Sequence, residues 1–171
     1  ILFSPIMLVV ATLIKLTSPG PIIFRQERVG LHNKPFMMYK FRSMVQQTEA
    51  DEKKGWTVPG DPRVTRVGRF IRKTSIDEFP QFVNVFLGQM SVVGPRPPLP
   101  NEVAEYTEYD LQRLAVKPGI TGWWQVTERN DTDFAGMVRR DLEYIAKRGP
   151  ITDLKIVILT VIEVITGKGA C

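Results

Sequence analysis

The stretch "PIIFRQERVGLHNKPFMMYKFRSM", residues 21–44, has two apolar, β-prone runs on either side of a polar turn. The runs "PIIFRQERV" and "FMMYKFRSM" predict two strands, and "GLHNKP" predicts the turn of a β-hairpin. Because side chains alternate between the two faces of a strand, Lys40 and Arg42 share one face. Two cations on one face suit a bound phosphate, but they equally suit a solvated sheet edge.

Outside this hairpin the hydrophobic periodicity mostly predicts helices. The proline-rich segment 91–100, "SVVGPRPPLP", is the main exception and predicts a stiff loop that presents Arg96. The segment 116–126, "VKPGITGWWQV", predicts a turn and a short extended stretch, and the polar residues 46–60 predict a loop. We therefore expect an α+β fold, mostly helical with a small β-hairpin. Helices are expected over residues 62–73, from Ser75–Asp77 to Gly88, and over 101–114, 132–149 and 151–166.

The first fourteen residues, "ILFSPIMLVVATLI", carry no charge. As a helix they would extend about 21 Å, whereas a bilayer core is about 30 Å thick. Ser4 and Pro5 lie within this run, and a proline inside a helix tends to break it. This pattern favours a segment that enters one leaflet, bends and returns; the tail of a truncated spanning helix is the alternative. Because the chain starts at Ile1 without a methionine, we expect further sequence upstream.

Charge is distributed unevenly along the chain. Residues 15–73 have a local balance of +8, whereas residues 74–171 have −3. A basic half beside an apolar end indicates an anionic partner at a membrane surface, although a basic run is more often a solvated face. The single cysteine, Cys171, excludes an internal disulfide framework, and nothing around the single histidine, His32, supports a catalytic triad.

Two adjacent carboxylates, Asp77 and Glu78, follow the basic run in "KTSIDEFPQF", residues 73–82. "SIDE" matches a capping box with Ser75 as N-cap, which by itself favours a structural role. Nearby cations would lower a carboxylate pKa and keep the group ionised as a nucleophile. The chain also has more cations than two carboxylates need, and such an excess suits phosphates. Together with the apolar end, this points to phosphoryl transfer onto or from a lipid phosphate.

The chain resembles the bacterial sugar transferases, also called monotopic polyprenyl-phosphate phosphoglycosyl transferases, over nearly all of its 171 residues. The order of several motifs carries the resemblance: "FSPIMLVVATLIKLTSPGPIIFRQERVG", "YKFRSM", "DPRVTRVGRFIRKTSIDEFPQFVNVFLGQMSVVGPRP", "VKPGITGWWQV", "DLEYI" and "TDLKIVILT".

The resemblance implies how the chain meets a membrane. It implies a monotopic protein whose re-entrant N-terminal helix, residues 1–17, is broken at Ser4-Pro5. Residues 18–171 would form a catalytic domain with interfacial amphipathic helices on the cytosolic face of the bacterial inner membrane. The other half of the re-entrant helix would precede Ile1. The oligomeric state stays open, a homo-oligomer included.

The resemblance also implies a reaction. A UDP-sugar donates its sugar-1-phosphate to a polyprenyl phosphate such as undecaprenyl phosphate, and UMP is released. This is the first membrane step of exopolysaccharide, capsule, O-antigen or glycoconjugate synthesis. By resemblance, Asp77 attacks the β-phosphate and forms a phosphosugar-enzyme intermediate. Glu78 assists by positioning a metal or handling a proton. Mg²⁺ is expected, with Asp77 and Glu78 as its ligands.

The remaining site residues follow from matching positions. Lys40, Arg72, Arg96 and Arg129 would hold phosphates or the uridine, and Arg42 is included from its strand face. Asp141 of "DLEYI" matches a further functional position without an assigned role. Glu128 departs from the family pattern, which usually has glycine there, and this puts the geometry around Arg129 in question.

Two other functions remain open on the sequence. A glycosyltransferase that moves only the sugar to a lipid would release UDP instead of UMP. A non-enzymatic adaptor at a membrane surface, or a nucleic-acid-binding module, would not need Asp77. Nucleic acid is the weakest option, because the tryptophans and the basic run are not interleaved and no recognised nucleic-acid motif is present.

Overall fold

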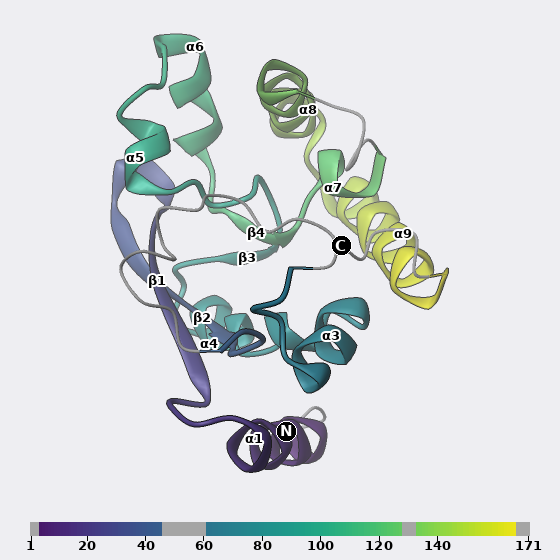
Figure 1. Cartoon of the computed structure of the whole chain (residues 1–171). Coiled ribbons are helices and arrows are strands. Elements are labelled where there is room, and N and C mark those ends of the chain that lie inside the picture. The colour runs from purple at the N-terminus through teal and green to yellow at the C-terminus, as the bar shows by residue number, and fades with distance from the viewer. Residues whose placement is uncertain (1–3, 46–60, 128–132, 167–171) are drawn as a thin grey trace.

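The computed structural model describes residues 4–45, 61–127 and 133–166. Within these ranges helices predominate, and two small sheets of two strands each lie among them (Figure 1). The expected α+β class is confirmed. The expected loop at 46–60 lies outside the described residues, and the division of the chain into units at residue 17 stays a prediction.

The predicted hairpin is present. Strand β1 (Ile23–Val29) pairs antiparallel with β2 (Pro35–Phe41). The turn between them contains a short 3₁₀ helix, η1 (Leu31–Asn33), in which His32 and Asn33 have left-handed backbone angles, with φ of 55° and 60°. Asparagine and histidine tolerate this region better than most residues, which suits "GLHNKP" to the turn.

A second sheet was not predicted from the sequence. Strand β3 (Ser91–Val93) pairs in parallel with β4 (Gly119–Thr121), and it begins the proline-rich segment that was expected to be a loop throughout. The strands come so close that a Cβ on Gly119 would lie 2.1 Å from the Gly94 nitrogen. Glycine is therefore required here, because any side chain would push the two segments apart.

Helix α1 (Ser4–Thr17) lies at one end of the molecule, next to α3 (Arg66–Lys73) (Figure 1). Its buried residues Val10 and Ile14 form one core cluster with Ile71 of α3 and Phe41 of β2. The helix therefore packs directly on the elements that flank the Asp77–Glu78 pair. It starts at Ser4-Pro5, and the predicted break there stays a prediction because residues 1–3 are not described.

Helix α3 is held at its start and along its side. Thr65 caps it by accepting a hydrogen bond from the Gly68 nitrogen at 2.8 Å. A Cβ on Gly68 would lie 1.8 Å from the Ser43 carbonyl oxygen, so only glycine lets the helix contact the end of the hairpin this closely. The predicted helix over 62–73 is thus confirmed, although its first turn begins at Arg66.

The single helix predicted from Ser75–Asp77 to Gly88 is wrong in its first part. A 3₁₀ turn, η2 (Ile76–Glu78), precedes α4 (Gln81–Phe86). Ser75 has φ of 54° and its side chain caps nothing, so the predicted capping box is also wrong. The physical reason is that a left-handed Ser75 reverses the chain after α3, which an N-cap residue in extended conformation does not do.

Fully buried Asn84 locks α4 to the hairpin. Its side-chain oxygen accepts a hydrogen bond from the Tyr39 nitrogen at 3.1 Å, and its nitrogen donates to the Met37 carbonyl at 2.7 Å. A polar side chain bonded on both sides to a strand backbone fixes the helix in register with β2. The turn that holds Asp77 and Glu78 is consequently fixed as well.

The single acidic helix predicted over 101–114 is also wrong. The structure has α5 (Pro100–Val103), α6 (Glu108–Leu111) and the 3₁₀ turn η3 (Gln112–Ala115). Thr107 interrupts the run because it forms a capping box with Asp110 and starts a new helix.

The C-terminal third is helical. The "WWQV" part of the segment predicted to be extended forms α7 (Trp123–Thr127). Helix α8 (Phe134–Lys147) is confirmed, with Asp133 as its N-cap, and α9 (Pro150–Thr166) follows it directly. Tyr144 of α8, Ile156 of α9 and Val93 of β3 form one buried cluster that joins these helices to the second sheet.

Large apolar side chains stay exposed on several of the described helices. Examples are Leu16 of α1 (78% exposed), Phe86 of α4 (90%) and Ile151 of α9 (86%). Of the helices in the described ranges, none combines the length and the apolar composition needed to cross a membrane.

Candidate active site

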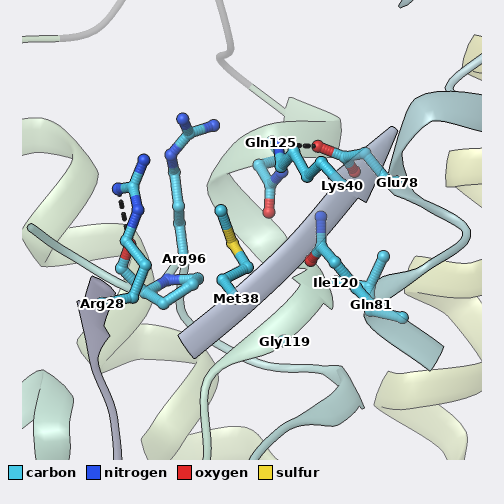
Figure 2. A pocket seen from close by; sticks show the side chains of 10 residues that line it. Arg28, Met38, Lys40, Glu78, Gln81, Arg96, Gly119, Ile120 and Gln125 are labelled. Atoms are coloured by element: carbon cyan, nitrogen blue, oxygen red, sulfur yellow. Dashed lines mark hydrogen bonds and ion pairs between the residues drawn. The ribbon is translucent and has the colours of Figure 1, made fainter. Parts of the chain in front are cut away.

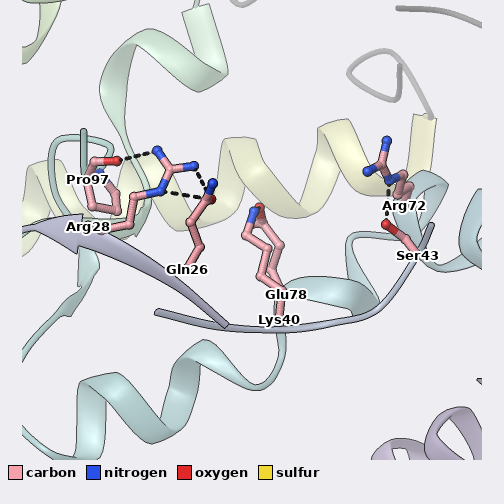
Figure 3. Close-up of polar contacts among 7 residues, drawn as sticks. All are labelled: Gln26, Arg28, Lys40, Ser43, Arg72, Glu78 and Pro97. Carbon is pink, nitrogen blue, oxygen red and sulfur yellow. Dashed lines mark hydrogen bonds and ion pairs between the residues drawn. The ribbon is translucent and has the colours of Figure 1, made fainter. Parts of the chain in front are cut away.

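Asp77 and Glu78 lie in η2, between the basic helix α3 and helix α4. Glu78 is half-buried, and its Oε1 accepts a hydrogen bond from Lys40 Nζ on β2 at 2.7 Å (Figures 2 and 3). The hairpin and the turn are therefore joined by an ion pair at the predicted catalytic carboxylates.

The pKa of Asp77 was predicted to be lowered, and this was wrong. Burial, followed by the negative charge of Glu78, raises the pKa of Asp77 from 3.8 to about 6. Lys40 and Arg72 act in the opposite direction but do not outweigh these two causes. The sequence showed the cations; it could not show how far the turn removes Asp77 from water.

Arg72 is held near this pair from the end of α3. Its Nε donates a hydrogen bond to Ser43 Oγ at 2.7 Å (Figure 3). The Ser43 carbonyl in turn accepts from the Thr65 nitrogen at 3.0 Å. The segment just after β2 thus supports a cation that acts electrostatically on Asp77.

A small cleft extends from Glu78 along the hairpin toward the proline-rich loop (Figure 2). Two predicted phosphate-binding residues, Lys40 and Arg96, line it together with Glu78. The remaining lining residues were not predicted: Arg28, Met38, Gln81, Pro97, Gly119, Ile120 and Gln125. The cleft therefore brings together carboxylate and guanidinium groups that are far apart in the sequence.

Arg28 is the main residue that the sequence reasoning missed. It is only 8% exposed, and burial, followed by the nearby charge of Arg96, lowers its pKa from 12.5 to about 10. The sequence feature that could have indicated Arg28 is "FRQERVG", residues 24–30. Arg28 lies two residues before Gly30 there, on the same strand face as Gln26. Burial of that face cannot be read from this charged, alternating pattern alone.

Four predicted catalytic or substrate-binding residues in the described ranges lie outside the cleft lining: Asp77, Arg72, Arg42 and Asp141. Asp77 and Arg72 lie beside it, because Asp77 is adjacent to Glu78 and the charge of Arg72 acts on Asp77. Arg42 is buried, and its Nη2 donates to the carbonyl and hydroxyl oxygens of Ser18, both at 2.8 Å, at the end of α1. Asp141 of α8 is 1% exposed and forms a close ion pair with Arg113. Their proposed parts in substrate binding stay predictions. Arg129 and Glu128 lie outside the described residues.

The adjacent carboxylates of Asp77 and Glu78 are the candidate ligands for Mg²⁺. In the ranges that the structure describes, no cluster of three or more His, Cys, Asp or Glu side chains could hold a metal ion. Mg²⁺ usually needs only one or two carboxylates, with waters and substrate phosphates as its other ligands. Asp77 and Glu78 are adjacent, and Glu78 raises the pKa of Asp77 through like-charge repulsion that a cation would relieve. The pair fits such an ion.

Comparison with known proteins now adds to this geometry. A model of the family described as bacterial sugar transferase matches residues 1–167. The chain belongs to the bacterial sugar transferase family. The predicted resemblance is thereby confirmed.

Several curated sugar transferases are similar to this chain. A UDP-glucose:undecaprenyl-phosphate glucose-1-phosphate transferase from Escherichia coli (strain K12) is 45% identical over 181 residues, which cover 99% of this chain and 38% of that protein. The galactosyl transferase CpsE of Streptococcus agalactiae serotype III (strain NEM316) is 46% identical over 162 residues, covering 88% and 36%. The uncharacterized sugar transferase EpsL of Bacillus subtilis (strain 168) is 43% identical over 166 residues, covering 97% and 81%.

The chain thus spans less than two fifths of the first two of these relatives and most of the third. The aligned part of these relatives covers 88–99% of this chain and so includes α3, η2 and the cleft.

Proposed function

We propose that this chain transfers sugar-1-phosphate from a UDP-sugar to a polyprenyl phosphate, such as undecaprenyl phosphate, and releases UMP. The observation that carries the proposal is that the charges of Lys40 and Arg72 act on Asp77, while its neighbour Glu78 lines a cation-rich cleft with Lys40, Arg28 and Arg96. The names of several relatives support it, because they describe transfer of sugar phosphate to undecaprenyl phosphate.

The first step forms a covalent intermediate on Asp77. A carboxylate oxygen of Asp77 attacks the β-phosphorus of the UDP-sugar, and a new oxygen–phosphorus bond forms. The bond from that phosphorus to the bridging oxygen breaks, and UMP leaves with this oxygen and its electron pair. A carboxylate with a raised pKa suits this attack, because poor solvation makes its lone pairs more available.

The second step regenerates the carboxylate. A phosphate oxygen of the polyprenyl phosphate attacks the same phosphorus, the bond to Asp77 breaks, and a polyprenyl-diphosphate sugar is released. The two steps let the water-soluble donor leave before the lipid acceptor reacts. No net oxidation, reduction or proton transfer is required for the balance of either step.

The neighbouring groups hold the phosphates and limit charge repulsion. A diphosphate would repel Asp77, so Lys40 and Arg72, whose charges act on Asp77, are proposed to bind the oxygens of the attacked phosphate. Arg96 is proposed to bind a phosphate further along the cleft. Mg²⁺ held by Asp77 and Glu78 would neutralise further phosphate charge. Glu78 also keeps Lys40 in place through their 2.7 Å ion pair.

The proposal includes a position at the membrane. The exposed apolar side chains of α1, α4 and α9 are proposed to enter one leaflet of the bacterial inner membrane from the cytosolic side. A monotopic arrangement of this kind would bring the cleft to the lipid phosphate. Co-sedimentation with phospholipid vesicles tests it: Phe86→Ser is expected to weaken binding, and unchanged binding would argue against a contact through α4.

The central experiment is mass spectrometry of the protein mixed with UDP-glucose or UDP-galactose and no acceptor. A sugar-phosphate adduct on a peptide containing Asp77, with release of UMP, is the expected result. Release of UDP would favour the alternative glycosyltransferase that moves only the sugar. If the product forms on adding undecaprenyl phosphate but no adduct is ever trapped, the covalent step is overturned.

A further inference from the structure

Arg28 is a buried cation held only by neutral groups. Its Nε and Nη2 donate to Gln26 Oε1, at 3.2 and 2.7 Å, and its Nη1 donates to the Pro97 carbonyl at 3.0 Å (Figure 3). A guanidinium has five N–H groups, so each terminal nitrogen keeps one N–H after these bonds. These three bonds hold Arg28 in place, but neutral acceptors do not cancel its positive charge. Among the residues that the structure describes, no carboxylate forms an ion pair with it.

Arg96 brings a second positive charge to the same place. Both arginines line the cleft, and Figure 2 shows their guanidinium groups projecting the same way. The side chain of Arg96 has no hydrogen bond or ion pair with any residue in the described ranges. Two like charges held together beside a cleft favour an anion between them.

Glu102, the carboxylate whose charge acts on Arg28, does not neutralise Arg28 and Arg96. Glu102 acts on Arg28 less than burial and Arg96 do. Its Oε2 accepts a hydrogen bond from the Leu99 nitrogen at 2.7 Å, so this carboxylate already caps α5.

The loop that carries Arg96 is fixed to the strand that carries Arg28. Besides the Arg28–Pro97 bond, the Val29 nitrogen donates to the Pro98 carbonyl at 2.9 Å. The Arg28 guanidinium and the backbone at Arg96 are therefore positioned before any ligand arrives, which reduces the entropy lost on binding.

The position of this pair differs from that of the carboxylates. Lys40 contacts Glu78 and pairs with Phe24 in the hairpin register. Phe24 precedes Arg28 by four residues on β1. At about 3.4 Å per residue, this is about 14 Å along β1. A phosphate attacked by Asp77 would lie beside Glu78 and Lys40 at one end of the cleft, and the arginine pair lines the other end.

We propose that Arg28 and Arg96 form a second anion subsite, which binds a phosphate group of a substrate, and that Arg28 is a substrate-binding residue. This inference rests on the proposed function, because that reaction brings two phosphate-bearing molecules to one cleft. The bound phosphate belongs either to the nucleotide half of the donor or to the lipid acceptor. Paired guanidinium groups with free N–H donors suit bidentate binding of either.

The test uses Arg28→Met, with Arg25→Met as the matched control. Arg25 is on the same strand but faces the other way, exposed, with its guanidinium over the Tyr39 ring at 5.8 Å. First, binding of inorganic pyrophosphate is measured without Mg²⁺ and without turnover. Then KM is measured in the full reaction, for UDP-glucose or UDP-galactose at saturating undecaprenyl phosphate, and for undecaprenyl phosphate at saturating donor.

Arg28→Met is expected to weaken pyrophosphate binding about tenfold or more and to raise one KM by a similar factor. A raised donor KM assigns the subsite to the nucleotide, and a raised acceptor KM assigns it to the lipid phosphate. Arg25→Met should leave all three values within about twofold. If the folded Arg28→Met protein also stays within that limit, Arg28 only supports the loop and the proposal is overturned.

Arg96→Met keeps the test decisive if Arg28→Met fails to fold, because it leaves the Arg28–Pro97 bond intact. Unchanged pyrophosphate binding in Arg96→Met would also overturn the subsite. Failure of the proposed function has a different signature: wild-type protein that binds pyrophosphate through both arginines yet releases no UMP from any donor.

Discussion

Asp77 and Asp141 share one electrostatic property but have different surroundings. Burial raises the pKa of each carboxyl from 3.8 to about 6. Asp141, a residue of α8, is almost completely buried and forms an ion pair with Arg113, which is also buried. Asp77 lies in a short turn that is partly open to solvent, beside Glu78 and near Lys40 and Arg72.

The difference shows that a raised pKa alone does not indicate a reactive carboxylate. Asp141 and Arg113 face each other in a closed pair, and Arg113 also donates to Tyr106 and to the Arg96 carbonyl. Through the Arg96 carbonyl, the pair stabilises the proline-rich loop that lines the cleft. Asp77 has like and unlike charges around it, is only partly buried, and is adjacent to Glu78, which lines the cleft. Such surroundings suit a nucleophile.

The largest effect is expected from Asp77→Asn. An amide cannot attack the β-phosphorus, so release of UMP without acceptor should fall by a factor on the order of 10³ or more. The melting temperature should stay the same or rise, because an ionised Asp77 is unfavourable in the folded state at pH 8. Rapid UMP release by Asp77→Asn would contradict the assignment of the nucleophile.

The next effect concerns the buried pair. Arg113→Met leaves Asp141 without its cation and should lower the free energy of unfolding at pH 8 by about 3–5 kcal/mol. Without Arg113 the pKa of Asp141 rises further, so at pH 5 the carboxyl is neutral and the loss should be smaller. Urea unfolding at both pH values measures this difference.

A matched double variant separates charge from packing. Arg113→Met combined with Asp141→Leu removes both charges and should recover much of the stability, because an apolar pair avoids the cost of burying ions. If the double variant is as unstable as Arg113→Met, the hydrogen bonds to Tyr106 and Arg96 matter more than the ion pair.

The sequence predicted the parts of the fold that depend on local pattern. The hairpin, α3 and α8 follow from strand alternation and helical periodicity. The parallel pairing of β3 with β4 was missed because it joins two three-residue segments about 28 residues apart, too short for a periodic signal. At Ser75 a good capping pattern was overridden by a left-handed turn.

The candidate site was predictable for residues in recognisable motifs and not for those defined by burial. Lys40, Glu78 and Arg96 were predicted and do line one cleft. Arg28 was missed, and the direction of the Asp77 pKa shift was wrong, because both depend on how much water the folded chain excludes. Charge can be counted from a sequence, but desolvation depends on packing.

The pH dependence of the first step provides a smaller effect. Since Asp77 must be ionised and its pKa is raised to about 6, kcat/KM for UMP release should be level from pH 7 to 8. Below pH 6 it should fall about tenfold per unit. Glu78→Gln removes the neighbouring negative charge, so the fall of its residual kcat/KM should begin at a lower pH than in the wild type. If the fall begins at the same pH, a group other than Asp77 controls it.

The smallest effect is expected at the support of Arg72. Ser43→Ala removes the 2.7 Å hydrogen bond to Arg72 Nε but leaves the backbone contacts of Ser43 with Thr65 unchanged. The loss should be about 1 kcal/mol, or roughly fivefold in kcat/KM for UMP release. If Ser43 acts by positioning Arg72, then Ser43→Ala should have almost no further effect in an Arg72→Met background. If the two losses are additive, Ser43 affects the reaction independently of Arg72, and its hydrogen bond is not needed to position Arg72 near Asp77.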